Sequence, residues 1–393
     1  MSEVAQVPQL RFPEFNGDLE EKKLDDVGSF KSGTGFTEAE QGGKSGVPFF
    51  KVSDMNLEGN QKVMVSANNY VNDEQIARLN YKPINKKSVI FAKVGAAVFL
   101  ERKRIADSFL IDNNMMAFTP TEDIDFIRQW FDTVRLSKYA QVGALPSYNA
   151  SDLKTIKINL PSLPEQTKIA SFLSSIDRKI EQLSKKQALL GEYKKGLMQQ
   201  IFSQAVRFKA DDGSEFPDWE EKKLGDVSDC LDNRRQPLNG AERNQMKGDI
   251  PYYGANGIVD YVNDYIFDEE LVLLAEDGGN FNDFSSKPIA QKISGKAWVN
   301  NHAHILKAKN IIATDFLFYS LVHKDIRRYI VGGSRAKLNK SDLLSIKTIL
   351  PPLEEQAKIA NFLSSVDNKI EQMGKQLDES KQFKKALLQQ MFV

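Results

Sequence analysis

The sequence contains almost no cysteine and has no excess of either charge. Its one cysteine, Cys230, excludes a disulfide framework and any multi-thiolate zinc site. Since 53 basic residues face 53 acidic ones, any basic surface must be local. No apolar run approaches the roughly 20 residues that cross a bilayer, and the N-terminal residues lack the pattern of a signal peptide. These absences exclude a disulfide-rich scaffold and indicate a reducing compartment, so we expect a cytoplasmic protein with no membrane partner.

The composition is that of a folded protein. Hydrophobic residues make up 41% of the chain and charged residues 27%, which provides enough apolar surface for packed cores. A chain of 393 residues is too long for one ordinary domain and suits two or three. An internal repeat decides how these domains are arranged.

The repeat is the strongest signal in the sequence. Residues 151–202 align with residues 341–392 without a gap, and about 29 of the 52 pairs are identical. The two cores read LPSLPEQTKIASFLSSIDRKIEQ and LPPLEEQAKIANFLSSVDNKIEQ. A shorter echo precedes each copy, because EEKKLDDV at Glu20 returns as EEKKLGDV at Glu220. The chain therefore alternates between variable and constant segments.

Each constant segment predicts a long helix. Its apolar residues recur at alternating steps of four and three, the heptad pattern of a helix that packs along another helix. Prolines at 161, 164, 351 and 352 lie where a strand ends and a helix begins, the one place where a helix tolerates proline. Since neither helix can bury its stripe alone, we expect the two to form an antiparallel pair. The predicted seam begins with Ile169, Leu173, Ile176, Ile180 and Leu183 in the first helix and with Ile359, Leu363, Val366, Ile370 and Met373 in the second. It continues through Leu190, Leu197 and Ile201, and through Leu377, Leu387 and Met391, with interruptions at Gln187, Lys194, Ser380 and Lys384.

The repeat also predicts the fold class and the domain boundaries. We expect a mixed α/β (α+β) protein in which two long antiparallel coiled-coil helices separate two globular domains in a pseudo-two-fold arrangement. Roughly 38 helical residues at about 1.5 Å each give a rod of nearly 57 Å. The predicted boundaries are a globular domain over residues 1–155, a helical region over 156–204, a second globular domain over 205–345 and a second helical region over 346–393.

The two variable regions differ over most of their length but share a skeleton. VPFF from Val47 matches IPYY from Ile250, and VIFAKVG ending at Gly95 matches LVLLAEDG ending at Gly278. DNNMMAF and VNNHAHIL match next, followed by VGALPSYNASDL and VGGSRAKLNKSDL. Short β-branched and aromatic runs broken by Gly, Asn and Asp predict a mixed sheet with long functional loops. One scaffold is therefore expected to carry two different surfaces.

Two surfaces on one scaffold are what direct reading of two different DNA half-sites requires. Phosphate contacts can be generic, whereas contacts to base edges must change with the base sequence. Arginine binds guanine and asparagine binds adenine bidentately, while lysine holds phosphates. The candidate DNA-binding residues are Lys51, Lys93, Arg102, Arg104, Asn113 and Asn114 in the first region, and Arg234, Arg235, Tyr253, Asn256, Asn301, His302, Arg335 and Lys337 in the second.

The repeated L-P-x-L-x-E-Q-x-K-I-A-x-F-L-S-S-x-D-x-K-I-E-Q unit, with the S-D-L-x-x-I-K before it, resembles the conserved regions of the specificity subunit of Type I restriction-modification systems. The resemblance covers both constant segments, and the GANG, GGN and NNHAH elements of the second variable region are similar to that family's recognition domains. The first variable region resembles those domains only in the skeleton of short motifs that it shares with the second. What the resemblance implies is a subunit that reads a bipartite DNA site, one half per target-recognition domain, with the helix pair fixing the gap.

The resemblance also implies partners for this chain. In the family the helices dock two methylation subunits, which bind S-adenosylmethionine, and the assembly can add restriction subunits that use ATP and Mg²⁺ to translocate DNA. On this basis we expect no cofactor and no catalytic residue in the chain itself.

Three patterns mimic enzyme or metal sites. Gly42-Gly43-Lys44-Ser45 ends like a phosphate-binding loop, but Glu38 stands where that motif needs glycine. Asp218 with Glu221 and Lys223 imitates a nuclease motif whose elements lie too close together for separate strands. His302 and His304 flank Ala303 as a metal pair would, but no third ligand has a suggestive spacing, and we predict no metal site.

Two other functions remain as alternatives. The chain could be a fused enzyme that carries its own recognition domains, although it shows neither the Asn/Asp-Pro-Pro-Tyr/Phe segment of adenine methyltransferases nor a glycine-rich loop for the methyl donor. It could instead be a coiled-coil adaptor that binds only proteins. An adaptor has no evident need for two scaffolds with different loops, which favours the DNA-reading hypothesis.

Overall fold

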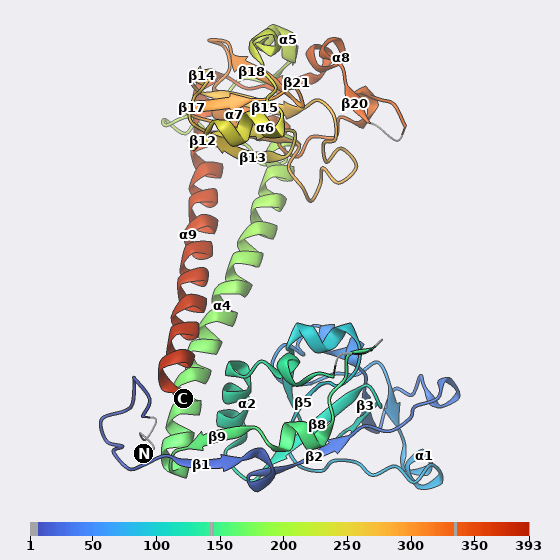
Figure 1. Ribbon diagram of the computed structural model, residues 1–393. Helices are drawn as coiled ribbons and strands as arrows, with labels where there is room; N and C mark the ends of the chain where they lie inside the picture. The colour runs from blue at the N-terminus through green and yellow to red at the C-terminus, as the bar shows by residue number, and fades with distance from the viewer. Residues whose placement is uncertain (1–6, 142, 144, 334–335, 393) are drawn as a thin grey trace. The chain divides into compact units, whose positions relative to one another are not determined.

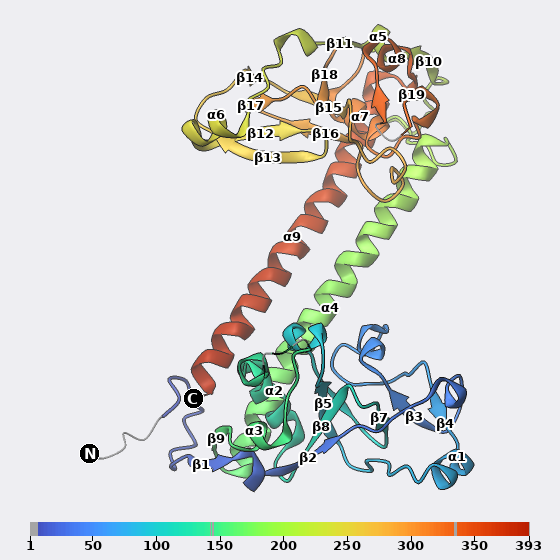
Figure 2. The ribbon, with the colours of Figure 1, turned by 45° about the vertical axis from the view of Figure 1, so that its right-hand side comes forward.

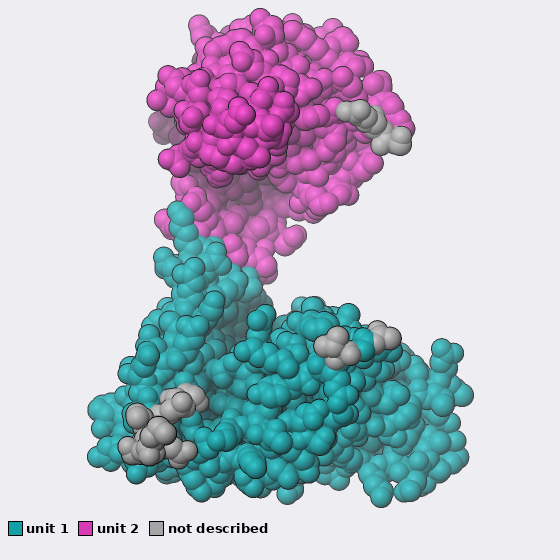
Figure 3. Space-filling view, in the orientation of Figure 1, with its two compact units in different colours: residues 1–185, 374–393 teal, residues 186–373 magenta. Residues whose placement is uncertain are grey.

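Both variable regions fold around sheets that mix parallel and antiparallel strands, as their short apolar runs predict (Figures 1 and 2). The computed structural model describes residues 7–141, 143, 145–333 and 336–392. The chain divides into two units, which Figure 3 colours separately. Unit 1 contains residues 1–185 and 374–393, and unit 2 contains residues 186–373.

In unit 1 a four-stranded sheet has the order β2-β8-β5-β6, and a smaller sheet has the order β4-β3-β7. Strand β5 lies inside this sheet, is apolar from Val89 to Ala92 and is buried along its whole length. Helix α2 packs on this sheet through Phe126, Trp130 and Phe131. The elements are β1 (Glu20–Lys23), β2 (Gly28–Ser32), β3 (Val47–Phe50), β4 (Tyr70–Val71), α1 (Asp73–Arg78), β5 (Ser88–Ala92), β6 (Lys103–Ala106), β7 (Leu110–Ile111), β8 (Met115–Pro120), α2 (Ile124–Thr133), α3 (Ala150–Lys154), β9 (Lys157–Leu160) and α4 (Leu163–Phe202).

Unit 2 repeats this plan. Its two larger sheets have the orders β11-β18-β15-β16 and β13-β12-β17-β14, and the buried apolar strand β15 takes the place of β5. The elements are β10 (Glu220–Lys223), α5 (Leu224–Val227), β11 (Ser228–Cys230), α6 (Gly240–Gln245), β12 (Lys247–Gly254), β13 (Gly257–Val262), β14 (Phe267–Asp268), β15 (Leu271–Ala275), β16 (Ala290–Ile293), β17 (Lys296–Val299), β18 (Ala303–Ala308), α7 (Thr314–Leu321), β19 (Ile330–Val331), β20 (Lys337–Leu338), α8 (Lys340–Ser345), β21 (Lys347–Leu350) and α9 (Leu353–Met391). Short 3-10 helices join them at residues 24–26, 38–40, 52–56, 96–100, 136–139, 232–234 and 327–329.

The echoes that precede the constant segments close each domain. β1 pairs with β9 antiparallel from Glu20 opposite Leu160, and β10 pairs with β21 in the same way from Glu220 opposite Leu350. The EEKK sequences therefore recur because each supplies one strand of a two-stranded ribbon at the entry to a long helix.

Backbone pairing gives the residue-by-residue correspondence of the two domains. Ala92 lies opposite Met115 in the first sheet, and Ala275 lies opposite Ala303 in the second. The matches predicted at Gly95 and Gly278 are confirmed by this register. The match of DNNMMAF to VNNHAHIL is wrong by one residue, because Asp112 corresponds to Asn300. The alignment had paired the two Asn-Asn dipeptides, which occupy different places in the turn.

The two long helices run antiparallel, as predicted. In unit 1, Leu387 and Met391 of α9 lie in one core with Ile169, Leu173 and Ile176 of α4. In unit 2, Met198 and Ile201 of α4 share a core with Ile359 and Leu363 of α9. The predicted seam residues are buried at the helix ends and half-buried towards the middle, at Ile180, Leu183, Ile370 and Met373. The described residues contain no helix long and apolar enough to span a membrane.

Two of the residues that interrupt the seam form ion pairs. The ammonium group of Lys384 lies 2.8 Å from Asp177 in unit 1, and that of Lys194 lies 2.6 Å from Asp367 in unit 2. These pairs are the same interaction in the two copies of the repeat. A shifted register would leave a mostly buried charge unpaired, which costs several kcal/mol. We infer that the polar positions fix the antiparallel register, as a polar residue does in other coiled coils.

The Glu-Gln pair of the repeated motif anchors the start of each helix. Glu165 accepts two hydrogen bonds from Arg11, at 2.6 and 2.7 Å, and Glu355 accepts two from Arg207, at 3.2 and 2.8 Å. Both carboxylates are almost fully buried. Each lies in the first helical turn, where the helix dipole stabilises a negative charge. The motif therefore recurs because it ties the helix to the segment before the EEKK strand.

Replacing Asp177 with alanine is expected to lower the free energy of unfolding of unit 1 by about 3 kcal/mol, because Lys384, Arg128 and Gln129 lose a shared buried acceptor. Burial alone would raise the pKa of Asp177, but its hydrogen bond from Lys384 and that residue's charge lower it overall. The contribution is therefore full above the unfolded pKa of about 3.9 and is lost as the pH falls through the lower folded pKa.

Urea denaturation of the full chain followed by circular dichroism measures this effect. The matched control is Asp378→Ala, on the exposed surface of α9, where an effect below about 0.5 kcal/mol is expected. Equal unfolding midpoints for the two variants at pH 7 would show that the Asp177 pair does not stabilise the helices.

Candidate nucleic-acid interface

In each unit, three loops meet beside the central strands. The loop after β5 bonds the loop before β8, since Lys93 N–H donates to the Asn114 carbonyl at 2.7 Å. The equivalent bond in unit 2 runs from Glu276 N–H to the His302 carbonyl at 2.8 Å. The third loop, before α3 or α8, joins them through Tyr148 or Leu338. Identical backbone bonds thus hold different side chains at equivalent positions.

In unit 2 these loops border an open groove of about 1240 Å³. Three residues predicted from the sequence line it, namely Asn256, Asn301 and His302. The others include Leu238, Asn239, Glu242, Arg243, Tyr252, Ile258, Val259, Asp277 and Asn300. The groove is therefore formed by the three loops together with the β12–β13 hairpin and helix α6.

The polar groups of the groove are held in fixed orientations. His302 Nδ1 lies 2.5 Å from Asp277 Oδ1, and its backbone N–H donates to Asn300 Oδ1 at 2.8 Å. Asn256 donates to the Gly278 carbonyl at 2.8 Å. Asn301 is exposed at the rim. Such amide and imidazole groups can bind base edges, while the exposed Ile258 and Val259 on β13 can contact a thymine methyl.

A buried charged network adjoins the same loops. Both ring nitrogens of His304 face acceptors, the Asp232 carboxylate at 2.6 Å and the Leu338 carbonyl at 2.8 Å. Burial would lower the pKa of His304, but these bonds and the charge of Asp232 raise it to about 9. Burial likewise opposes the shift of Asp232, whose pKa is lowered to about 2 chiefly by His304. The pair is therefore ionic at neutral pH.

Arg235 belongs to this network. It was predicted to contact DNA, but its guanidinium donates to Glu276 at 2.5 Å and to the Ala303 carbonyl at 3.0 Å. Lys337 lies 3.0 Å from the same Glu276 while its side chain stays half exposed. Arg235 therefore supports the loops from within, whereas Lys337 remains available at the surface.

The other predicted residues of the second region are more scattered. Arg234 stacks on Phe267 with 4.5 Å to the ring centroid and pairs with Glu269 at 3.0 Å. Burial raises the pKa of the half-buried Tyr253. Arg335 lies outside the described residues. DNA contact by these three stays a prediction.

In unit 1 the structure separates the predicted residues into two groups. Lys93, Asn113 and Asn114 lie on the loops after β5 and before β8, and Lys51 follows β3, whose Phe50 carbonyl accepts from Asp112 N–H at 3.0 Å. Lys93 donates to Ser32 at 3.2 Å, and Lys51 donates to Gln41 at 3.2 Å. These four residues form the counterpart of the unit 2 loops.

The arginines of unit 1 point elsewhere. Arg104 donates to the Asn60 carbonyl at 2.8 Å, and burial lowers its pKa. Arg102 donates to the Asn56 side chain. Both side chains hold the loop that follows β3, and their contact with DNA stays a prediction.

Sequence reasoning missed several residues of the groove. Asp277 is a turn residue that carries no DNA-binding signal of its own, and the exposed Ile258 and Val259 are of residue types usually found in the core. Adjacent apolar residues on a strand point to opposite faces, and this pair lies beyond the sheet's buried part. The GANG turn before them was the available signal.

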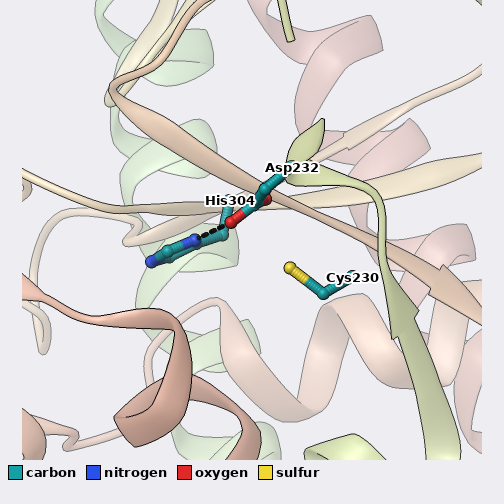
Figure 4. A group of neighbouring side chains, drawn as sticks. All are labelled: Cys230, Asp232 and His304. Atoms are coloured by element: carbon teal, nitrogen blue, oxygen red, sulfur yellow. Dashed lines mark hydrogen bonds and ion pairs between the residues drawn. The ribbon is translucent and has the colours of Figure 1, made fainter. Parts of the chain in front are cut away.

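One group of side chains in unit 2 could hold a metal ion. The ligand atoms of Cys230, Asp232 and His304 all lie within 4.8 Å of one another (Figure 4). No sequence pattern predicts this set, because Cys230 and His304 are distant in the chain and meet only when β11 pairs with β18.

Comparison with known proteins adds family evidence to this geometry. The family model described as Type I restriction modification DNA specificity domain matches residues 16–190 and 217–381. A putative type I restriction enzyme specificity subunit of Haemophilus influenzae is 37% identical over 156 residues, covering 39% of this chain and 38% of the relative. Another, from Methanocaldococcus jannaschii, is 27% identical over 388 residues, covering 90% of this chain and 88% of the relative.

Solved structures show the same fold. The S subunit of a Type I restriction-modification system from M. genitalium aligns with a TM-score of 0.65 at 17% identity, covering 99% of both chains. A chain from a study of assembly in the type I R-M system aligns with a TM-score of 0.54 at 15% identity, covering 95% of this chain and 97% of that one. At these identities the likeness concerns the fold alone.

Proposed function

We propose a function from one premise: the chain belongs to the Type I restriction modification DNA specificity family. It acts as the specificity subunit of a restriction-modification complex. Each globular domain reads one half of a bipartite DNA site, and the two long helices set the gap between the halves. The complex acts on DNA in the cytoplasm.

The proposal depends on one observation: the two units share the same backbone hydrogen bonds at these loops but carry different side chains there. Where unit 1 places Lys51, Lys93 and Asn114, unit 2 places Gly254, Glu276 and His302. Equivalent backbone bonds hold all of these positions. Phosphate contacts alone would not require such differences, whereas reading two base sequences does.

Partner subunits supply the chemistry. We propose that two methylation subunits, which bind S-adenosylmethionine, dock on the helices, and that restriction subunits using ATP and Mg²⁺ join the complex. The chain itself is non-catalytic and binds none of these cofactors. The competing hypothesis of a fused enzyme predicts that the purified chain alone methylates or cuts plasmid DNA when given S-adenosylmethionine, Mg²⁺ and ATP. The proposal predicts activity only with the partners present.

Selection from random duplexes tests the DNA-reading role. The chain, purified with its methylation subunits, is mixed with a pool of randomised DNA, and bound duplexes are sequenced. Two short specific segments separated by an unspecified gap of fixed length are expected. A single uninterrupted motif, or no enrichment, would refute the two-domain assignment.

Replacing Asn301 with alanine is expected to weaken binding to the selected site by roughly 10- to 100-fold, equivalent to about 1–3 kcal/mol for one base contact. The loss should appear as relaxed preference within one half-site only. Fluorescence anisotropy at fixed salt measures it, because affinity for DNA depends steeply on ionic strength.

The matched control is Asn310→Ala. Both asparagines are exposed, but Asn301 precedes β18 and Asn310 follows it, so they lie at opposite ends of the strand. The control is expected to bind like the unmodified chain. Equal loss in both variants, or unchanged binding by Asn301→Ala, would remove this residue from the DNA-reading surface.

A further inference from the structure

Cys230, Asp232 and His304 bring three different metal-ligating groups together inside unit 2 (Figure 4). Cys230 ends β11, Asp232 begins the next turn, and His304 lies on the adjacent strand β18. The side chains of His304 and Asp232 are 1% and 8% exposed. We propose that these residues form a Zn²⁺ site that stabilises unit 2 by linking β11 to β18.

Groups around the three residues hold them in the orientation that a metal needs. His304 Nε2–H donates to the Leu338 carbonyl at 2.8 Å, which turns Nδ1 towards Asp232 Oδ2 at 2.6 Å. Asp232 Oδ1 accepts from Ile305 N–H at 3.0 Å, so Oδ2, which also lies 3.4 Å from the Arg235 guanidinium, is the oxygen that faces His304. Metal-binding histidines typically donate their other N–H to a carbonyl or carboxylate in this way. In the metal-free chain a proton on Nδ1 takes the ion's place.

The three ligands match the charge of zinc. A neutral His304 imidazole, a Cys230 thiolate and an Asp232 carboxylate sum to zero with the dication. Nearby, Arg235 and Lys337 both pair with Glu276, at 2.5 and 3.0 Å, and these contacts lie beside the ligands. No net charge is therefore added to a mostly buried region, where it would be costly.

The ligand chemistry favours zinc. Thiolate, imidazole and carboxylate together suit Zn²⁺, whereas Mg²⁺ and Ca²⁺ prefer oxygen ligands alone. Three protein ligands leave a fourth position for a water molecule. Glu276 is held by Arg235 and Lys337, so it stays outside the coordination sphere. The ion would link β11 and the following turn to β18, and its ligand His304 lies two residues after His302 of the groove.

Cobalt provides a direct test, since Co²⁺ replaces Zn²⁺ in tetrahedral sites and absorbs light. The chain has a single cysteine, so a thiolate-to-cobalt charge-transfer band in the near ultraviolet can come only from Cys230. We expect the full chain to develop this band with one equivalent of Co²⁺ and to lose it when Zn²⁺ is added. Zn²⁺ should also raise the melting temperature, because it binds only the folded state.

Two variants make the result specific. Cys230→Ser, at a half-exposed thiol, should fold normally by circular dichroism, lack the band and bind Zn²⁺ at least tenfold more weakly. His323→Ala, which changes the histidine bonded to the Phe284 carbonyl, should keep the band. Absence of the band and of a Zn²⁺-induced melting shift in the unmodified chain would overturn the site. Equal Zn²⁺ affinity of Cys230→Ser and the unmodified chain would do the same, and neither result depends on DNA recognition.

Discussion

Replacing residues 25–150 with the corresponding segment of another family member is expected to change one half of the recognised DNA site and to leave the other unchanged. This segment carries the converging loops of unit 1 with Lys51, Lys93, Asn113 and Asn114. It ends before β9, so the ribbon with β1 and the start of α4 stay in place. Each altered base pair costs about 1–3 kcal/mol, so binding to the original site should fall by orders of magnitude.

The reciprocal exchange, over residues 225–340, is the control for this experiment. It should change the other half-site and preserve the first. Duplex selection with each hybrid complex gives both halves at once. If either exchange altered both halves, the two domains would not read DNA independently.

Inserting seven residues into each long helix is expected to lengthen the gap between half-sites by about three base pairs. Seven residues at about 1.5 Å each add roughly 10 Å, and one base pair of DNA spans about 3.4 Å. The insertions belong after Lys185 in α4 and after Lys375 in α9. Both places lie between the Asp177–Lys384 and Lys194–Asp367 ion pairs, so each pair is preserved. A heptad keeps the apolar seam in phase.

The control inserts seven residues into α4 alone. The seam and one of the two ion pairs are then out of register, and loss of the assembled complex is expected instead of a longer gap. Duplex selection measures the gap for the double insertion. An unchanged gap in a folded, DNA-binding double variant would show that the helices do not set the spacing.

The sequence predicted the fold well because the repeat made its periodic signals visible twice. One heptad stripe such as Ile169 to Leu183 is common in ordinary helical bundles, but the matched copy from Ile359 indicated a self-paired helix. The EEKK strands were recognised as echoes, although their pairing with β9 and β21 was not foreseen. Sequence identity between the two halves shows which segments are constant. The pairing of β1 with β9 and of β10 with β21 explains why the EEKK segments are among them.

The ion-pair partners of the polar seam residues could not be predicted from the sequence. Lys194 and Lys384 interrupt the predicted seam, because a heptad pattern assigns no partner to a charge at a core position. Their partners, Asp367 and Asp177, lie on the other helix. Only the antiparallel register brings the two together.

The candidate site was predicted in part. Residue types suited to DNA identified Asn256, Asn301 and His302, which the structure gathers at one groove. The same criterion selected Arg235, which is bonded inward to Glu276. Charge and amide content cannot distinguish an outward side chain from one that holds a loop. That distinction depends on the register of the strands. The sequence alignment is off by one residue here, and it therefore does not match Asp112 to its structural equivalent, Asn300.

Methylated bases can be mapped across the genome, in cells with and without the gene for this chain. One modified motif with two specific halves and a fixed gap is expected, present only when the chain is present and altered in one half by each domain exchange. A motif without a gap, or methylation that persists when the chain is absent, would contradict the proposed function.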